Sequence, residues 1–591
     1  MNDLVYNEIV ATPGYELEFA VGTTYSLDAE AFLAIALSFA RLGDVTDTDF
    51  QSPFRLLEGL RQANNRIAIF CNRGGLQPPV RMNSLYAMLD KSVFEVADER
   101  KGCELSNFHP KLWIIKERAI DNHDKCLIKL IVISRNLTKD TSLDCAVSMT
   151  APLGVRTNGE TRRKHRPLKD LLLILAEKAS PDKKKKIKKL ANDIESMGAF
   201  ELDSPYEDYE FLPFHFGENL NKNIDFQSEL PGEKMVVVSP FIDLESLSWL
   251  NSFRPKSEKV LITRLDSLSQ EIMDLYSRDK REIWVMTQIA EQNDIQPMNL
   301  HAKMYFSWVS KTGGVHLWLG SANATRNGFH RNSEFLLKLT LKRGRKQFED
   351  FKAEFCDEKK QMCEQITSLP QKDSVKEDNS LAINVRRNLI SRNNLSAEIT
   401  EQQGSYSVII SAKKIKDIKG KITIAPIQEP LNEAHLTTEL RQCTIQVKNA
   451  SHLSEFYILK ITPENETLET LKMVIKIPTK GIPEDRDDKI FRSIIDTREK
   501  FLNYVEMMIT DRPQEFTALL MQNCESSLNK PTSWKISHNN TLYESLLRIA
   551  ATNPERLEDL QDLVNRLDLQ VVPESFAQMC GKFKESIKKL R

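Results

Sequence analysis

The chain has 591 residues, a length that exceeds what one hydrophobic core supports and predicts roughly three or four domains. Its content of 41% hydrophobic and 28% charged residues is typical of a globular, soluble protein. The 82 Lys and Arg residues almost balance the 83 Asp and Glu residues, which excludes an overall basic field, so any nucleic-acid site must be a local patch.

Three further features predict a cytoplasmic protein. The first residues, Met1-Asn2-Asp3-Leu4-Val5, lack a signal-peptide pattern. No apolar run approaches the roughly 18–20 residues that a membrane-spanning helix needs, so we expect no membrane segment. The nine cysteines are scattered without a Cys-x-x-Cys pair and predict reduced thiols, not a disulfide framework or a zinc site.

The first predicted unit covers residues 1–154 and combines apolar strands with one helical segment. Its elements follow in this order: an apolar stretch at 18–21, a helical pattern at 26–33, and strands at 66–71, 107–115, 130–136 and 144–147. The strand at 107–115 carries His109 and Lys111. The next strand ends in Ser134-Arg135-Asn136, and Asp144 leads the closing strand.

Residues 155–230 form a basic insertion with two clusters of positive charge. One cluster contains Arg162, Arg163 and Lys164, and the other contains Lys184 and Lys185. A charge run of this kind is consistent with a solvated helix face or a loop. It is equally consistent with a surface that binds a phosphate backbone beside an active site.

The second predicted unit, 231–370, repeats the order of the first and ends in a trailing helix. Its elements are a strand at 235–241, a helical pattern at 242–250, and strands at 259–263, 299–307, 316–323 and 334–337. His301 and Lys303 form the second His-x-Lys motif, and Ser321-Ala322-Asn323 the second Ser-x-Asn segment. The Asn follows the His by 27 residues in the first unit and by 22 in the second. This internal repeat predicts two α/β halves, each with a mixed sheet, packed about a pseudo-two-fold axis with both motif strands at the seam.

Two tail domains are predicted after the repeat. Short alternating apolar runs in 384–480 predict a small β domain, and apolar residues at a 3.6-residue spacing in 488–591 predict a helical domain. Neither range contains a motif with recognisable chemistry.

The two motifs carry the predicted chemistry. Positions i and i+2 of a strand point to the same face, so His109 and Lys111 project together, as do His301 and Lys303. Two Lys and two Asn side chains supply donors for the oxygens of a phosphodiester, on which charge grows in the transition state. A neutral imidazole can attack phosphorus, and a protonated one can donate to the leaving oxygen. No carboxylate cage for Mg²⁺ stands beside the motifs, so we expect no metal and no other cofactor.

This pattern resembles the phospholipase D superfamily over roughly residues 15–345. The second motif matches well, with His301, Lys303, Gly320-Ser321, Asn323 and Glu334. The first departs from the family pattern, because Gly does not precede Ser134 and Asp144 follows Asn136 by only eight residues. Lys116 and Trp308 replace the family's Asp seven residues after each His, as in the His-Lys-Asn variant of tyrosyl-DNA phosphodiesterase and metal-independent restriction nucleases.

The resemblance implies a nuclease or DNA-processing enzyme that forms a covalent phosphohistidine. It implies His109 as nucleophile and His301 as acid, with Lys111, Lys303, Asn136 and Asn323 on the phosphoryl oxygens. It also implies that Asp144 and Glu334 hydrogen-bond the histidine of one motif and fix its tautomer. Ser134 and Ser321 are expected either to orient the asparagines or to donate to the phosphate. By analogy, the partner is DNA, with a helicase or ATPase of a prokaryotic defence or repair system as a further partner.

Several alternatives remain open at the level of the sequence. The chain could be a non-catalytic nucleic-acid-binding or assembly subunit with a relict site, or a lipid phosphodiesterase. A further His-x-Lys, His123-Asp124-Lys125, is expected in a loop because only 11 residues separate it from Ser134. His330 is expected on a surface loop and His316 in a structural role, while core packing is favoured over base stacking for Trp113 and Trp318.

Overall fold

The computed structural model describes most of the chain. The described residues are 9–39, 52–79, 84–97, 106–138, 142–216, 229–278, 280–286, 299–309, 314–341, 345–356, 362–369, 385, 389–390, 394–415, 418, 420–437, 439, 441–465, 468–509, 546–549, 555–567 and 570–590.

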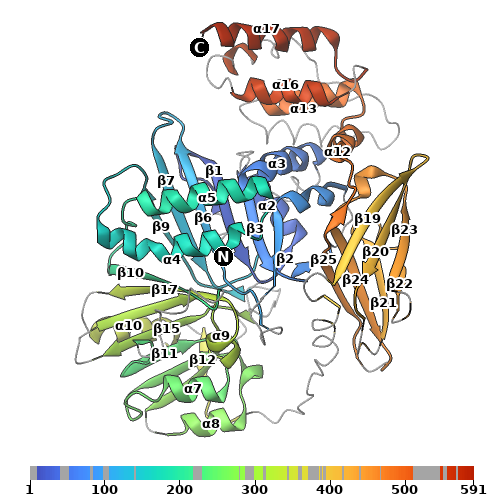
Figure 1. Cartoon of the computed structure of the whole chain (residues 1–591). Helices are drawn as coiled ribbons and strands as arrows, with labels where there is room; N and C mark the ends of the chain where they lie inside the picture. Colours follow the sequence, from blue (N-terminus) through green and yellow to red (C-terminus); the bar gives the residue numbers. More distant parts are fainter. Residues whose placement is uncertain are drawn as a thin grey trace, which may run out of the picture.

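The first half is built on a six-stranded mixed sheet covered by helices α2 (Ala29–Phe39) and α3 (Pro53–Arg66) on one face (Figure 1). The sheet order is β5-β3-β1-β6-β7-β9. The strands are β1 (Tyr15–Thr24), β3 (Ile67–Asn72), β5 (Val93–Val96), β6 (Leu112–Ala119), β7 (Cys126–Ile133) and β9 (Ala146–Pro152). β1, β3 and β5 are parallel, whereas β6, β7 and β9 join by antiparallel pairing.

The second half has the same order and the same strand directions within an eight-stranded sheet, β10-β17-β16-β15-β11-β12-β13-β18. Its strands are β10 (Tyr206–Phe214), β11 (Lys234–Val238), β12 (Lys259–Thr263), β13 (Arg281–Met286), β15 (Met304–Val309), β16 (Gly314–Gly320), β17 (Glu334–Leu341) and β18 (Cys363–Gln365). Helices α7 (Leu244–Leu250) and α8 (Gln270–Tyr276) pack on one face. The predicted α/β class is therefore confirmed.

Several strands are not indicated by the sequence pattern, and one of them occupies the same place in each half. β5 and β13 lie where a loop is expected between the buried strand and the His-x-Lys motif. They have only four and six residues, too few for a period-two pattern to stand out from a short apolar run. Their parallel pairing with β3 and β12 widens each sheet beyond the expected order.

The segment expected as a basic insertion contributes two helices and a strand. α4 (Gly159–Ala176) and α5 (Pro181–Ser196) pack against each other and into the core that the two sheets share. β10 follows them and pairs antiparallel with β17, so the sheet of the second half already begins before residue 230. In Figure 1 the two helices lie across the first sheet.

The tail contains a β domain of two sheets, one of which is completed by strands of the first half. One sheet is β23-β20-β19-β26 and the other is β2-β4-β25-β24-β21-β22. β2 (Leu27–Asp28) and β4 (Leu76–Gln77) come from the first half, and Leu76 pairs with Val474 of β25. The tail strands are β19 (Leu395–Gln402), β20 (Ser405–Ala412), β21 (Gly420–Pro426), β22 (Ala434–Leu436), β23 (Gln442–Val447), β24 (Phe456–Pro463), β25 (Leu471–Lys476) and β26 (Thr479–Lys480).

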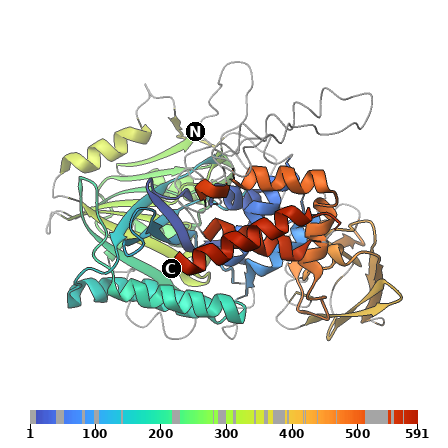
Figure 2. The same ribbon diagram turned by 90° about the horizontal axis from the view of Figure 1, so that it is seen from above.

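Four described tail helices pack onto the α2–α3 side of the first sheet, in one apolar core. They are α12 (Arg486–Ile494), α13 (Arg498–Ile509), α16 (Glu555–Arg566) and α17 (Glu574–Leu590). Figure 2 shows the β domain on one side of the molecule and the paired sheets on the other, and Figure 1 shows the red C-terminal helices above them.

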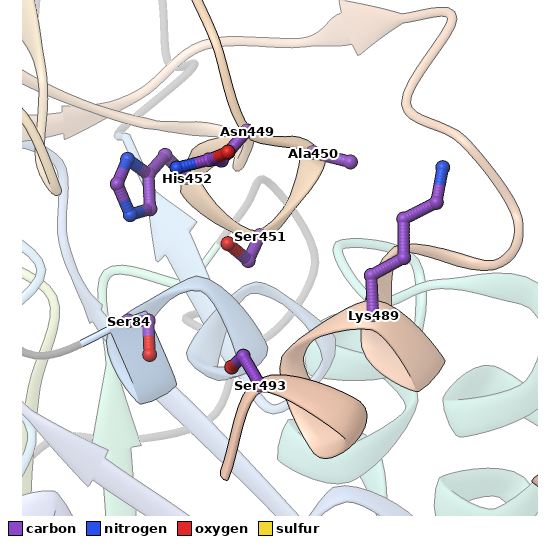
Figure 3. A pocket seen from close by; sticks show the side chains of 7 residues that line it. All are labelled: Ser84, Asn449, Ala450, Ser451, His452, Lys489 and Ser493. Atoms are coloured by element: carbon purple, nitrogen blue, oxygen red, sulfur yellow. The ribbon is translucent and has the colours of Figure 1, made fainter. Parts of the chain in front are cut away.

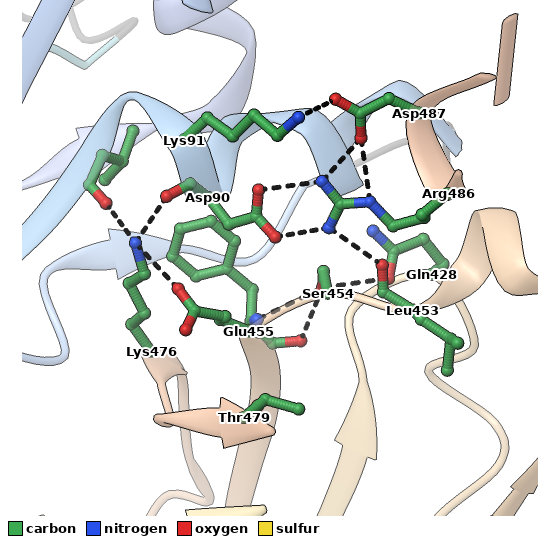
Figure 4. A network of polar contacts seen from close by, with 12 residues as sticks. Asp90, Lys91, Gln428, Leu453, Ser454, Glu455, Lys476, Thr479, Arg486 and Asp487 are labelled. Atoms are coloured by element: carbon green, nitrogen blue, oxygen red, sulfur yellow. Dashed lines mark hydrogen bonds and ion pairs between the residues drawn. The ribbon is translucent and has the colours of Figure 1, made fainter. Parts of the chain in front are cut away.

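A buried ion pair holds α12 to the first half (Figure 4). The Arg486 guanidinium donates to both carboxylate oxygens of Asp90, with one bond of 3.1 Å, and also to Asp487. Lys476 of β25 donates to the carbonyl oxygens of Asp90 and Val93, at 2.6 and 2.8 Å. Paired and hydrogen-bonded charges of this kind tolerate burial, so the network connects the tail firmly to the repeat.

Candidate active site

The two motifs lie at one edge of each sheet, next to strand ends. His109 and Lys111 come immediately before β6, and His301 and Lys303 immediately before β15, so each motif precedes the strand in which the sequence predicts it. Asn136 follows β7 and Asn323 follows β16 at the same edges, because these strands run antiparallel to β6 and β15. The expected common direction of His and Lys still holds in the first motif, where Lys111 Nζ lies 3.0 Å from His109 Nε2.

At the motifs, the backbone of each half donates a hydrogen bond to the backbone of the other half. The His109 N–H donates to the carbonyl oxygen of Ser333, and the His301 N–H donates to that of Leu143, both at 2.9 Å. Ser333 and Leu143 are the residues directly before Glu334 and Asp144. These two equivalent hydrogen bonds are what a pseudo-two-fold axis between the halves requires.

Glu334 of the second half holds the imidazole of His109. Its Oε2 lies 2.9 Å from His109 Nδ1 and also accepts from the Ser321 hydroxyl, while Oε1 accepts from Asn332 Nδ2 at 3.2 Å. A carboxylate accepts hydrogen bonds, so Nδ1 carries the proton. Nε2, the other ring nitrogen, therefore presents a lone pair towards Lys111.

Burial lowers the pKa of His109 to about 4, and the positive charges of Lys111 and Lys303 act in the same direction against the partial opposition of Glu334. The imidazole is therefore neutral at neutral pH, as a nucleophile requires.

The two motif lysines share one site. Burial and the nearby charge of Lys303 hold the pKa of Lys111 well below its usual value. Lys303 Nζ reaches into the first half and donates to the carbonyl oxygen of Ser134 at 3.3 Å. Two buried ammonium groups repel each other unless an anion lies between them, so the arrangement favours binding of a phosphoryl group.

The motif asparagines each leave a polar atom unsatisfied. Within the described residues, Oδ1 of Asn136 and Oδ1 of Asn323 are buried without a hydrogen-bond partner. An unpaired buried polar atom costs free energy, and such atoms in a folded protein call for an explanation. Because amide oxygen and nitrogen exchange places on rotation, either asparagine can present Nδ2 to an oxygen of a bound phosphodiester.

Asp144 is the counterpart of Glu334 but makes different contacts. It accepts from the hydroxyls of Ser134 and Ser142, at 3.2 and 2.8 Å, and lies 3.6 Å from Arg135 Nε. Burial raises the pKa of the Asp144 carboxyl. Ser134 repeats the role of Ser321. The Ser134 hydroxyl donates to Asp144 and accepts from the N–H of Cys145. The Ser321 hydroxyl donates to Glu334 and accepts from the N–H of Phe335.

Three residues around His109 carry no motif by which the sequence identifies them. The Tyr25 ring lies 5.1 Å from the His109 ring and 6.0 Å from Lys111 Nζ. Asn332 binds Glu334, and Asn72 Oδ1 accepts from the N–H of Phe108 at 2.9 Å. Tyr25 directly follows β1, the neighbour of β6, and Asn72 ends β3, the next strand along the sheet. Their position at these strand ends is the signal that could have identified them.

The basic residues of α4 and α5 divide into paired and exposed groups. Lys164 binds Asp208 at 2.6 Å, and Lys184 binds Glu177 at 2.5 Å. Arg162, Arg163 and Lys185 are exposed. Lys183 and Lys186, in the same run, donate to the carbonyl oxygens of Ile67 and Asn65 at the end of α3. A substantial part of the charge run thus attaches the helices to the first half.

Trp113, Trp318, His123 and His316 lie as expected, whereas His330 is exposed as expected but ends a short helix in place of the expected loop. Trp113 and Trp318 are fully buried in the apolar cores. His123 is exposed in the turn between β6 and β7, and His330 is exposed at the end of α9 (Arg326–His330). His316 is half-buried within β16, with its Nδ1 3.3 Å from the Thr340 hydroxyl.

Other features of the described residues bear on cofactors and location. Seven cysteines in this part of the chain are free thiols, while Cys103 and Cys524 lie outside it. Among the residues that the structure describes, no group of three or more His, Cys, Asp or Glu side chains could hold a metal ion. No helix in the same part of the chain is both long and apolar enough to cross a membrane.

A separate pocket of about 410 Å³ lies at the junction of the first half with the tail (Figure 3). It is bounded by η2 (Ser84–Lys91), η5 (Ala450–His452) and α12. Its lining residues are Ser84, Asn449, Ala450, Ser451, His452, Lys489 and Ser493. These differ from all the residues predicted for the active site.

Comparisons with solved structures find similar folds at low similarity. A polyphosphate kinase from Porphyromonas gingivalis has a TM-score of 0.35 and 10% identity over 62% of this chain. NucT from Helicobacter pylori has a TM-score of 0.21 and 13% identity, with 26% of this chain and 97% of NucT covered. Phosphatidylserine synthase from Haemophilus influenzae has a TM-score of 0.34 and 10% identity, with 63% of this chain and 87% of the synthase covered.

This chain spans 47% of the length of the polyphosphate kinase. No protein-family model matches the sequence, and neither does any curated protein.

Proposed function

We propose that this protein is a phosphodiesterase of the phospholipase D superfamily that cleaves nucleic acid, DNA in particular, without a metal ion. The observation that carries the proposal is the contact between His109 Nδ1 and Glu334 Oε2 at 2.9 Å across the two halves. It gives a buried imidazole one fixed tautomer and leaves Nε2 as the nucleophilic atom.

The reaction has two steps. His109 Nε2 attacks phosphorus and forms a P–N bond, while the P–O bond to the leaving group breaks and His301 donates a proton to that oxygen. His301 then accepts a proton from water, whose oxygen attacks phosphorus and breaks the P–N bond. Lys111, Lys303, Asn136 and Asn323 stabilise the negative charge on the phosphoryl oxygens in both transition states.

The choice of nucleic acid as substrate rests on the residues seven positions after the motif histidines. Lys116 makes ion pairs of 2.9 Å with Glu18 and Asp193, and so has a structural role in place of the acidic residue of lipid-cleaving members. The exposed Arg162, Arg163 and Lys185 are proposed to contact the DNA backbone. A helicase or ATPase of a defence or repair system is the proposed partner.

The test is cleavage of labelled single- and double-stranded DNA by the purified protein in EDTA. We expect cleavage by the wild type and a loss of about 10³-fold or more in His109→Ala and His301→Ala. His123→Ala, at the exposed His-x-Lys, is the matched control and should retain full activity.

Three outcomes would contradict the proposal. Undiminished activity in both single variants would exclude the assigned mechanism. Hydrolysis of phospholipid vesicles in preference to DNA would establish the lipid alternative. Tight DNA binding without turnover would establish the relict-site alternative, to which the different contacts of Asp144 and Glu334 lend some support.

A further inference from the structure

Phe241 is a half-exposed aromatic residue on the same sheet edge as the second motif. In the second sheet, β16, β15, β11 and β12 are consecutive neighbours. Asn323, Lys303, Phe241 and Arg264 lie just beyond the ends of these four strands, in this order and at one edge. Since adjacent strands are about 4.8 Å apart, the Phe241–Arg264 pair is displaced from the motif by about 5 to 10 Å along the edge.

The backbone at Phe241 is fixed to the Ser-x-Asn segment. The Ser239 hydroxyl donates to the carbonyl oxygen of Phe241 at 2.7 Å and accepts from the N–H of Ala324 at 3.0 Å. Ile242 forms a parallel bridge with Ala324, the residue after Asn323. Phe241 therefore occupies a defined position beside a residue that is proposed to hold the phosphoryl group.

The side chain of Phe241 is held by a cation and not by an apolar core. The guanidinium of Arg264 lies 5.4 Å from the ring centroid, and Asp266 holds the guanidinium through two charge-assisted bonds. The Phe241 residue is 49% exposed. One face of the ring is thus supported, and the ring retains exposed surface.

The repeat shows that the fold itself does not require an aromatic residue here. In the first half, the Thr24 hydroxyl bonds the carbonyl oxygen of Ser26 and the N–H of Leu137, as Ser239 does with Phe241 and Ala324. Ser26 is therefore the counterpart of Phe241. It is buried and donates to the carbonyl oxygen of Gly75 at 3.1 Å. The same turn accepts a small buried residue in one half and an exposed aromatic one in the other.

We propose that Phe241, supported by Arg264, stacks on a nucleobase adjacent to the scissile phosphate and thereby selects an unpaired strand. This inference rests on the proposed function, because it assumes nucleic acid at the motif site. A base whose phosphate lies at the motif can stack on a ring one or two strands along the edge only if it is free of its own duplex stack. Stacking on aromatic side chains is tolerant of sequence, so we expect a preference for single strands without a preferred base.

The test compares Phe241→Ala and Phe241→Trp with a matched control, Phe253→Ala. Phe253 is exposed to a similar extent, 43%, but lies at the opposite edge of the sheet, where its carbonyl oxygen accepts from Lys259 at the start of β12. The ligands are a single-stranded oligonucleotide and the same oligonucleotide with abasic spacers at successive positions. Binding is measured by fluorescence anisotropy with every protein, the reference included, carrying His109→Ala, so that metal-independent cleavage of the oligonucleotide does not alter the signal.

We expect Phe241→Ala to weaken binding of the intact oligonucleotide about 10-fold, with Phe241→Trp and Phe253→Ala close to wild type. An abasic spacer at the stacking position should weaken the wild type similarly and remove the difference between wild type and Phe241→Ala. Trp fluorescence of Phe241→Trp should be quenched by the intact oligonucleotide and less by the abasic one.

Equal binding by wild type and Phe241→Ala, or no binding of single strands by the wild type, would overturn the inference. Cleavage that persists in that case would leave the proposed function intact. Conversely, Phe241-dependent binding without any cleavage would refute the nuclease while preserving the stacking site.

Discussion

His109 in the first half and Glu334 in the second form a hydrogen bond of 2.9 Å that joins the nucleophile candidate to its orienting carboxylate across the pseudo-two-fold axis. Glu334 is fully buried, and its two carboxylate oxygens accept hydrogen bonds from the side chains of His109, Ser321 and Asn332. Neither half alone contains both members of this pair. The duplication is therefore a requirement of the site and not merely a record of how the chain arose.

Replacement of Glu334 tests this relationship. Glu334→Gln removes the charge and puts an NH2 donor in place of one carboxylate oxygen, so the His109 ring loses its preferred tautomer. We expect kcat to fall about 10²- to 10⁴-fold, as for carboxylates that orient a catalytic imidazole. Asp144→Asn should have a smaller effect, since Asp144 bonds Ser134 and Ser142 within its own half. Steady-state kinetics in EDTA would measure both, and an equal loss in the two variants would contradict the asymmetry.

The pH dependence of the reaction follows from the depressed pKa of His109. Burial lowers this pKa to about 4, from an ordinary value of 6.5. The nucleophile therefore stays neutral down to about pH 4, and we expect the acid limb of kcat/KM to lie well below pH 6. A profile of kcat/KM between pH 3.5 and 9 would check this. An acid limb centred near 6.5 would mean that the imidazole titrates as if it were in water.

The same shift makes stability depend on pH. The unfolded chain binds a proton at His109 below pH 6.5, whereas the folded chain does so only below about pH 4, so stability falls as the pH drops from 6.5 towards 4. Burial lowers the pKa of His165 and His316 to about 4 as well, and these residues add to the effect. Thermal unfolding at pH 7, 6, 5 and 4 should show a falling Tm. His109→Gln should reduce this slope but leave the part due to His165 and His316.

The sequence predicts the site more completely than it predicts the connections between domains. The repeated His, Lys, Ser and Asn positions identify both motifs, because catalytic residue types at fixed offsets from a strand are visible without coordinates. The bond between His109 and Glu334 spans 225 positions and depends on how the halves dock. For Tyr25, only the pairing of β1 with β6 reveals that its ring contacts His109. β2 and β4 have two residues each and join the sheet of the tail domain, which no local pattern indicates.

A phosphate-like anion should stabilise the folded protein through its two motif lysines. Lys303 helps to depress the pKa of Lys111, and an anion between the two ammonium groups would relieve this repulsion. At ten times Kd, a ligand that binds only the folded state contributes about 1.4 kcal/mol, which raises Tm by a few degrees. We expect orthovanadate or phosphate to raise the Tm of the wild type.

Lys111→Met and Lys303→Met should lose most of this anion-dependent rise. Lys185→Met, an exposed position on α5, is the control and should keep it. A differential scanning fluorimetry titration at constant ionic strength would separate specific binding from general salt effects. An identical rise in all three variants would exclude the motif lysines as the anion site.

The ion pair between Arg486 and Asp90 should dominate the stability of the junction between repeat and tail. Both side chains are buried, and Arg486→Ala would leave the Asp90 carboxylate buried without its main partner, at a cost of about 3 to 5 kcal/mol. The neighbouring pair of Lys91 and Asp487 has a lysine side chain that is 51% exposed, so Lys91→Ala should cost about 1 kcal/mol or less. Urea denaturation, followed by tryptophan fluorescence, would compare the two variants.

The double variant Arg486→Met with Asp90→Leu removes both charges and should recover much of the loss. If the single and double variants were equally unstable, packing and not the unpaired charge would account for the effect.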